Sequence, residues 1–152
     1  MENTGIWVAV AVIVFVMGSI FGLRVSPREK ALGLMREKAR KMGLHPRLVV
    51  APDWTKIPKA TESRASMVAY YSVLIADARL PLMRALVTDQ KLNVLHGDEK
   101  FQGLPIALKG IYAIDMQANC VGIYWDEEAD LRATQLDEMK AFLHSLTERY
   151  RD

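Results

Sequence analysis

Apolar and polar residues are arranged along this chain in three successive patterns, each of which predicts a different kind of element. The first is an uncharged run of 21 residues from Asn3 to Leu23, which ends at Arg24. A helix rises about 1.5 Å per residue, so the run reaches about 31 Å and matches a hydrocarbon core of roughly 30 Å. The pattern therefore predicts one transmembrane helix, with residues 1–24 as a membrane anchor.

A cleaved signal peptide is the alternative interpretation of this run. Such a peptide has a basic amino-terminal region, a shorter apolar stretch and an A-x-A-like cleavage site. The first four residues contain no Lys or Arg, and no A-x-A pattern follows the run. We therefore expect the span to be retained.

The second pattern is a narrow apolar stripe directly after the anchor. Ser26 and Glu29 form a capping box around Pro27, and Gly43 provides a stop. The segment 25–43 is thus predicted as an amphipathic basic helix, which either lies along the headgroups or packs on the domain that follows. The stripe repeats at 3-4-3 spacing through Leu32, Met35, Ala39 and Met42.

The third pattern has period two and predicts strands within a domain over residues 44–152. Residues 82–95 are ambiguous, because they fit either a hairpin around Asp89 and Gln90 or a segment whose first half is helical. A meander of short strands closed by one terminal helix is similar to PH-like domains. The clearest strand candidates cover residues 47–51, 67–75, 111–116 and 120–125.

The carboxyl-terminal stretch returns to a helical period. Its apolar residues could form a short coiled-coil seam, but two heptads are few, so we favour a helix packed on a sheet. The chain is therefore predicted as α+β: a transmembrane helix, a juxtamembrane helix, four to six antiparallel strands and a terminal amphipathic helix. The predicted contact face of that last helix is Leu136, Met139, Leu143, Leu146 and Tyr150.

Basic residues next to the span predict its orientation. None precedes the span, whereas seven follow it within 18 residues. The positive-inside rule places the amino terminus outside and the domain in the cytoplasm, at the inner membrane if the source is bacterial. We call these seven residues the basic collar: Arg24, Arg28, Lys30, Arg36, Lys38, Arg40 and Lys41.

The charges also divide the soluble part into two regions. Residues 24–64 hold 11 Lys and Arg against four acidic residues, and residues 65–152 hold nine against 13. The collar could bind anionic lipid headgroups, or it could serve only to orient the span, which we favour. Because the collar has no interleaved aromatic residues, nucleic-acid binding is not expected.

Small residues within the span indicate a helix–helix contact. Gly18 and Gly22 lie one turn apart and flank Ser19, so that another helix could approach closely. The partner on this face would be an integral membrane protein complex or a second copy of the chain, as a homodimer.

The sequence offers few candidate catalytic or metal-binding residues. Cys120 lies in an apolar strand, where a buried inert thiol is expected, and His96 shares a loop with Asp98 and Glu99, where solvated turn residues are usual. None of the common nucleotide, zinc-protease or serine-hydrolase motifs occurs. We therefore predict no catalytic, metal or cofactor residues and no enzymatic activity.

The order of an uncharged span, a charged helix (SPREKALGLMREKARKMGL) and a small β-containing domain resembles single-pass bacterial inner-membrane proteins. The layout is similar to that of the small auxiliary subunit of the Sec translocase. The similarity covers about the first 50 residues and implies a role beside a larger membrane complex. The leading hypothesis is a non-enzymatic accessory or scaffold subunit. A module that binds anionic lipid through the collar and a small enzyme using Cys120 or His96 are the alternatives.

Overall fold

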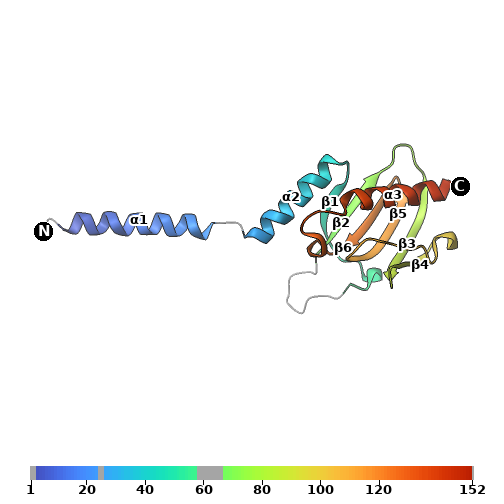
Figure 1. Ribbon diagram of the computed structural model, residues 1–152, viewed down its shortest axis with the longest axis horizontal. Coiled ribbons are helices and arrows are strands. Elements are labelled where there is room, and N and C mark those ends of the chain that lie inside the picture. Colours follow the sequence, from blue (N-terminus) through green and yellow to red (C-terminus); the bar gives the residue numbers. More distant parts are fainter. Residues whose placement is uncertain (1–2, 24–25, 58–66, 152) are drawn as a thin grey trace. The chain divides into compact units, whose positions relative to one another are not determined.

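The computed structural model describes residues 3–23, 26–57 and 67–151, and it divides the chain into two units (Figure 1). The first unit is Met1–Lys30 and the second is Ala31–Asp152. The division falls inside the predicted juxtamembrane helix, so that most of this helix belongs to the second unit.

Helix α1 (Thr4–Gly22) is the predicted apolar helix. It is 19 residues long, has a mean hydropathy of 2.4, and buries none of its residues. By length and composition it could cross a membrane. At both Gly18 and Gly22 an added Cβ would meet open space, and the Ser19 hydroxyl donates to the Phe15 carbonyl at 2.9 Å. The small-residue face is therefore exposed within this unit.

Helix α2 (Pro27–Lys41) begins and ends as the sequence predicts. The Glu29 N–H donates to the Ser26 hydroxyl at 3.2 Å, which is half of the expected capping box. At the other end Gly43 has a φ of +91°, and the Leu44 N–H donates to the Ala39 carbonyl at 3.0 Å. Glycine adopts this left-handed conformation without a Cβ clash, and the chain can turn directly into the first strand.

Six strands form one antiparallel sheet in the order β1-β2-β6-β5-β3-β4, so the expected meander is wrong. The β5–β6 hairpin lies between β2 and β3. The connection from β2 to β3 passes the turn of this hairpin, where the Ile75 N–H donates to the Asn119 carbonyl at 2.7 Å. The strands are β1 (His45–Val50), β2 (Met67–Leu74), β3 (Leu80–Thr88), β4 (Lys91–His96), β5 (Ile111–Ala118) and β6 (Cys120–Trp125).

The ambiguous segment is a hairpin, and its helical alternative is wrong. Strands β3 and β4 pair up to Thr88 and Lys91, and a two-residue turn joins them. Both turn residues, Asp89 and Gln90, have positive φ values, 51° and 59°. This is the backbone twist that tight hairpins require, and Asp tolerates it better than most residues.

Helix α3 (Leu136–Arg151) packs on β2 and β6, which confirms the predicted helix on a sheet. Its predicted contact residues Leu136, Met139, Leu143 and Leu146 are buried in the main core, and Tyr150 packs at the edge of that core. Met35 and Ala39 of α2 belong to the same core. Of the two expectations for the juxtamembrane helix, the structure therefore favours packing on the domain.

A charged network also joins α2 to the domain. The Arg36 guanidinium donates to both carboxylate oxygens of Glu127, at 2.6 and 3.0 Å, and the Tyr71 hydroxyl donates to Glu127 Oε2 at 2.6 Å. Glu127 is 6% exposed and begins the short 3-10 helix η3 (Glu127–Asp130). The hydrogen bond to Glu127 raises the pKa of Arg36, so this guanidinium stays charged.

Candidate binding face of the sheet

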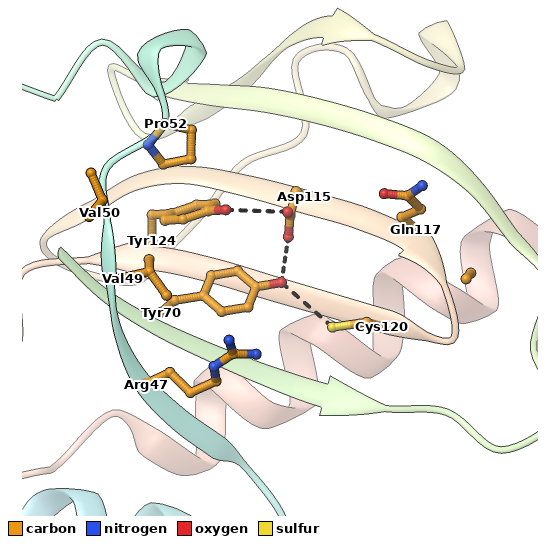
Figure 2. Close-up of a pocket in the computed structure, with 10 residues that line it drawn as sticks. Arg47, Val49, Val50, Pro52, Tyr70, Asp115, Gln117, Cys120 and Tyr124 are labelled. Carbon is orange, nitrogen blue, oxygen red and sulfur yellow. Dashed lines mark hydrogen bonds between the residues drawn. The ribbon is translucent and has the colours of Figure 1, made fainter. Parts of the chain in front are cut away.

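Helices α2 and α3 pack on one face of the sheet, and side chains of the opposite face point the other way (Figure 2). We call this opposite side the tyrosine face, after Tyr70 of β2 and Tyr124 of β6, which are direct neighbours in the strand register. One step along the sheet, Asp115 of β5 lies opposite Gly122 of β6. Alternation along each strand brings these residues to one side, while their sequence neighbours enter the main core.

Asp115 is the polar centre of the tyrosine face. The Tyr70 hydroxyl donates to its Oδ1 at 2.6 Å and the Tyr124 hydroxyl donates to its Oδ2 at 3.4 Å. The two tyrosine rings lie 4.7 Å apart between centroids, and Figure 2 shows both hydroxyls turned toward the carboxylate. Each oxygen of this carboxylate thereby accepts a hydrogen bond from a tyrosine, Tyr124 on the adjacent strand β6 and Tyr70 on β2, which is two strands away.

Gly122 makes the arrangement sterically possible. A Cβ built on Gly122 would overlap the ring and the hydroxyl of Tyr70. The tyrosine therefore lies across the sheet over the glycine and reaches Asp115 on the next strand. A glycine within a strand often marks such a close approach.

Burial determines the protonation of the cluster. Loss of hydration, followed by the proximity of Asp115, raises the pKa of Tyr70 and of Tyr124 far above the ordinary tyrosine value. Burial also raises the pKa of Asp115, although the hydrogen bonds from both tyrosines oppose that shift. At neutral pH the tyrosines are therefore neutral hydrogen-bond donors, and the reduced hydration of Asp115 disfavours its charged form.

The raised pKa of Asp115 predicts that the Asp115→Asn variant gains stability relative to wild type as pH rises. Between the unfolded pKa, about 3.9, and the higher folded value, the native protein binds more protons than the unfolded chain. Wild-type stability therefore falls as pH rises through the folded pKa, and the asparagine variant lacks this loss. Urea unfolding of the full-length protein in detergent, from pH 4 to pH 8, measures the difference.

The exposed Asp137→Asn variant, unfolded in parallel, is the control for the loss of one carboxylate charge. A gap between Asp115→Asn and wild type that moves in the opposite direction with pH would show that the folded pKa of Asp115 is lowered.

A pocket of about 470 Å³ lies on the tyrosine face. Strand β1 provides one wall, which is mostly apolar, and the Asp115 cluster provides the polar part (Figure 2). Arg47 at the rim is exposed, and its side chain makes no hydrogen bond or ion pair within the described residues. The lining residues are Arg47, Val49, Val50, Pro52, Tyr70, Asp115, Gln117, Ala118, Cys120 and Tyr124.

Aromatic packing closes one end of the tyrosine face. Trp54, in the short 3-10 helix η1 (Asp53–Thr55), meets Tyr124 edge-on with 5.7 Å between centroids. The Arg84 guanidinium lies 5.4 Å from the centre of the Trp54 ring, a cation–π distance. A small second core forms here, separate from the main one. This second core includes both Tyr70 and Tyr124.

Cys120 has a different environment from the one expected. It is half-buried, lines the pocket, and its sulfur lies 3.6 Å from the Tyr70 hydroxyl. The expectation of a buried thiol is wrong, because Cys120 shares the face of Gly122 and Tyr124 and not that of the core. His96 ends β4, and strands β5 and β3 lie between β6 and β4, so the sheet does not bring His96 to Cys120. Asp98 accepts a hydrogen bond from the Lys100 N–H at the start of η2 (Glu99–Phe101), as a cap.

The basic collar is divided by the fold. Arg36 is bound to Glu127, and the Lys38 ammonium donates to the Ala133 carbonyl at 2.9 Å. Arg24 lies outside the described residues. The other collar residues on α2, Arg28, Lys30, Arg40 and Lys41, are exposed, and the Lys41 ammonium lies 3.4 Å from the Glu37 carboxylate.

Two residues in the sequence indicate the tyrosine face, Asp115 and Gly122. Asp115 is the one acidic residue of the apolar segment 111–116, and Gly122 interrupts the next strand. A carboxylate in a half-buried strand requires a partner, and a glycine there indicates a close neighbour. Neither residue indicates Tyr70 as the partner, because the pairing of β2 with β6 is set by the topology.

The chain matches no family model, no curated protein and no solved structure.

Proposed function

We propose that this protein is a non-enzymatic accessory or scaffold subunit of a larger bacterial inner-membrane complex. In this proposal α1 spans the membrane once with its amino terminus outside, and the sheet domain lies in the cytoplasm. The tyrosine face holds a cytoplasmic segment of the partner. The observation that carries the proposal is the pocket on this face, where a pre-organised polar centre lies beside an apolar wall.

The chemistry of the pocket is that of a binding surface. Tyrosine is enriched at binding surfaces because its large, rigid ring carries one polar hydroxyl group. Here Tyr70 and Tyr124 are held in place by Asp115 before any partner arrives, which lowers the entropic cost of binding. Arg47 supplies a positive charge at the rim. The fitting partner is an extended segment with an acidic residue for Arg47 and apolar residues for the β1 wall.

The span would provide the second contact with the complex. The Gly18 and Gly22 face has room for a close helix neighbour, which supports docking in the membrane. The basic flank supports the proposed orientation. A tether of this kind would keep the domain beside its partner and raise the effective concentration of the tyrosine face.

Copurification from native membranes tests the proposal. Tagged full-length protein should retain its partner, whereas Arg47→Glu combined with Gln117→Trp should lose most of it. The first change reverses the rim charge, and the second places a large ring at an exposed pocket position. We also expect Gly18→Ile combined with Gly22→Ile to weaken retention.

Arg132→Glu is the matched control, because Arg132 is exposed and does not line the pocket. It should retain the partner as wild type does. Equal retention by the pocket variant and the control would remove the tyrosine face from the interface. Equal retention by the glycine variant would do the same for the span.

A further inference from the structure

The two edge strands of the sheet, β4 and β1, differ in the chain segments that cover them. The outer side of β4 is covered by the segment that follows it: the Leu92 N–H donates to the Leu104 carbonyl at 2.9 Å, and the Gly103 N–H donates to the Leu92 carbonyl at 2.8 Å. Further along, the Val94 N–H donates to the Gln102 side chain at 2.8 Å. Strand β1 is the other edge, and within the described residues it pairs only with β2. Uncovered edges are sites where further strands add.

Apolar side chains accompany this edge. Leu48 is 49% exposed and, by strand alternation, lies on the side opposite to Arg47 and Val49, whereas Val50, the last residue of the strand, is 60% exposed and also lines the pocket. Met67, the register partner of Val50 on β2, is 54% exposed. Within the described residues, backbone groups without a strand partner and exposed apolar side chains thus occur at the same edge of the sheet.

We propose that β1 pairs antiparallel with β1 of a second copy of this chain, about a twofold axis at Leu48. This inference does not depend on the proposed function. It would join two six-stranded sheets edge to edge, with the same surface contributed by both copies, as a closed dimer requires.

The sequence of β1 selects this register. Centred on Leu48, the pairing places Leu48 opposite its own copy and Arg47 opposite Val49 of the other chain. Centred on Arg47, it would bring two guanidinium groups face to face, which is destabilising. Pro46, which lacks an N–H, falls opposite Val50 at the ends of the pairing, where one missing hydrogen bond costs least.

The register also extends the pocket. Arg47 and Val49 line it, so Val49 of the second copy would stand beside Arg47 of the first. The tyrosine faces of two copies would then be continuous. Arg47→Glu should leave the dimer intact, because its neighbour across the twofold axis is the apolar Val49.

Disulfide cross-linking of the full-length protein tests the register. In a Cys120→Ala background, Leu48→Cys places two thiols directly opposite, with Cα atoms about 5 Å apart, within the range that a disulfide spans. Val50→Cys is the matched control, because Val50 is an apolar residue of the same strand and is more exposed than Leu48. In this register the two position-50 residues of the dimer would be offset by four residues along the strands, so their Cα atoms would lie roughly 14 Å apart.

Under mild oxidation in native membranes, we expect Leu48→Cys to form the covalent dimer at least about tenfold more than Val50→Cys, because only the first pair meets the geometric requirement. Leu48→Lys, also at an exposed position, should lower the dimer fraction of detergent-solubilised protein while its circular dichroism stays unchanged. Equal cross-linking of both variants would indicate random collision and overturn the proposal. Absence of cross-linking at Leu48 would overturn it as well, whether the protein is a monomer, a dimer joined through α1, or bound at β1 by a foreign strand.

Discussion

Replacing Arg36 by Met is expected to lower the free energy of unfolding by about 3 kcal/mol. Removal of one member of a buried ion pair typically costs about 3–5 kcal/mol, and the expected loss lies at the lower end of that range. Glu127 is 6% exposed, and among its side-chain hydrogen bonds to described residues it would keep the one from Tyr71. A carboxylate with little hydration and one partner is costly, since the lost guanidinium had satisfied both of its oxygens. Methionine preserves much of the side-chain length, so lost packing contributes little.

Urea unfolding of the full-length protein in detergent, followed by tryptophan fluorescence, measures this effect, because Trp125 lies in the main core. Arg40→Met is the control, since Arg40 is exposed on the same helix. The double variant Arg36→Met with Glu127→Gln should recover part of the loss, because the unpaired charge is gone. A coupling energy near zero between the two positions would contradict the account of this network.

The hydrogen-bonded network of Arg36, Glu127 and Tyr71 also affects the local opening of helix α2. Helix α2 leads from the first unit to the sheet domain, and Arg36 with Met35 and Ala39 binds its second half to that domain. In the Arg36→Met variant we expect the second half of α2 to exchange amide hydrogens faster than α3 does, because local opening no longer breaks the ion pair.

Replacing Gly122 by Ala is the second change with a large expected effect, a loss of about 3 kcal/mol. The added methyl group would occupy the space of the Tyr70 ring, so the ring must leave its position over the strand. Overpacking of this kind costs about 1–3 kcal/mol, and a lost hydrogen bond to a charged group adds roughly 1.5–3 kcal/mol. The pocket should lose its polar centre at the same time, because Tyr70 no longer holds Asp115.

Gly33→Ala is the matched control for Gly122→Ala, because a Cβ at Gly33 meets open space on helix α2. It should raise stability by about 0.5–1 kcal/mol, as alanine does in helices. In a Tyr70→Ala background the change Gly122→Ala should cost almost nothing, since the overlapping ring is absent. A full cost in that background would show that the backbone, and not Tyr70, requires the glycine.

Local signals in the sequence were sufficient for the helices and most strands. Ser26, Glu29 and Gly43 set the limits of α2 through hydrogen bonds and backbone conformation within a few residues. The seam from Leu136 to Leu146 predicted the buried side of α3 because it depends only on helical period. Elements defined by neighbours in sequence are predictable from sequence.

The strand order and the tyrosine face depend on contacts between distant segments. Nothing local indicates that β6 pairs with β2, so the meander was the natural but wrong expectation. The misplacement of Cys120 has the same cause, because the side of a strand that faces the core is set by its register and not by its composition. Asp115 and Gly122 carried a usable signal, whereas Tyr70 acquires its role only through that pairing.

The central claim is that this protein belongs to a larger membrane complex, and its native composition tests that claim most directly. Tagged full-length protein would be released from native membranes with a mild detergent, and its mass and subunits would be determined by native mass spectrometry. The account predicts a complex that contains at least one other membrane protein in fixed stoichiometry. A species made only of this chain, whether monomer or dimer, would contradict the role as an accessory subunit, and a dimer of that kind would still allow the pairing through β1.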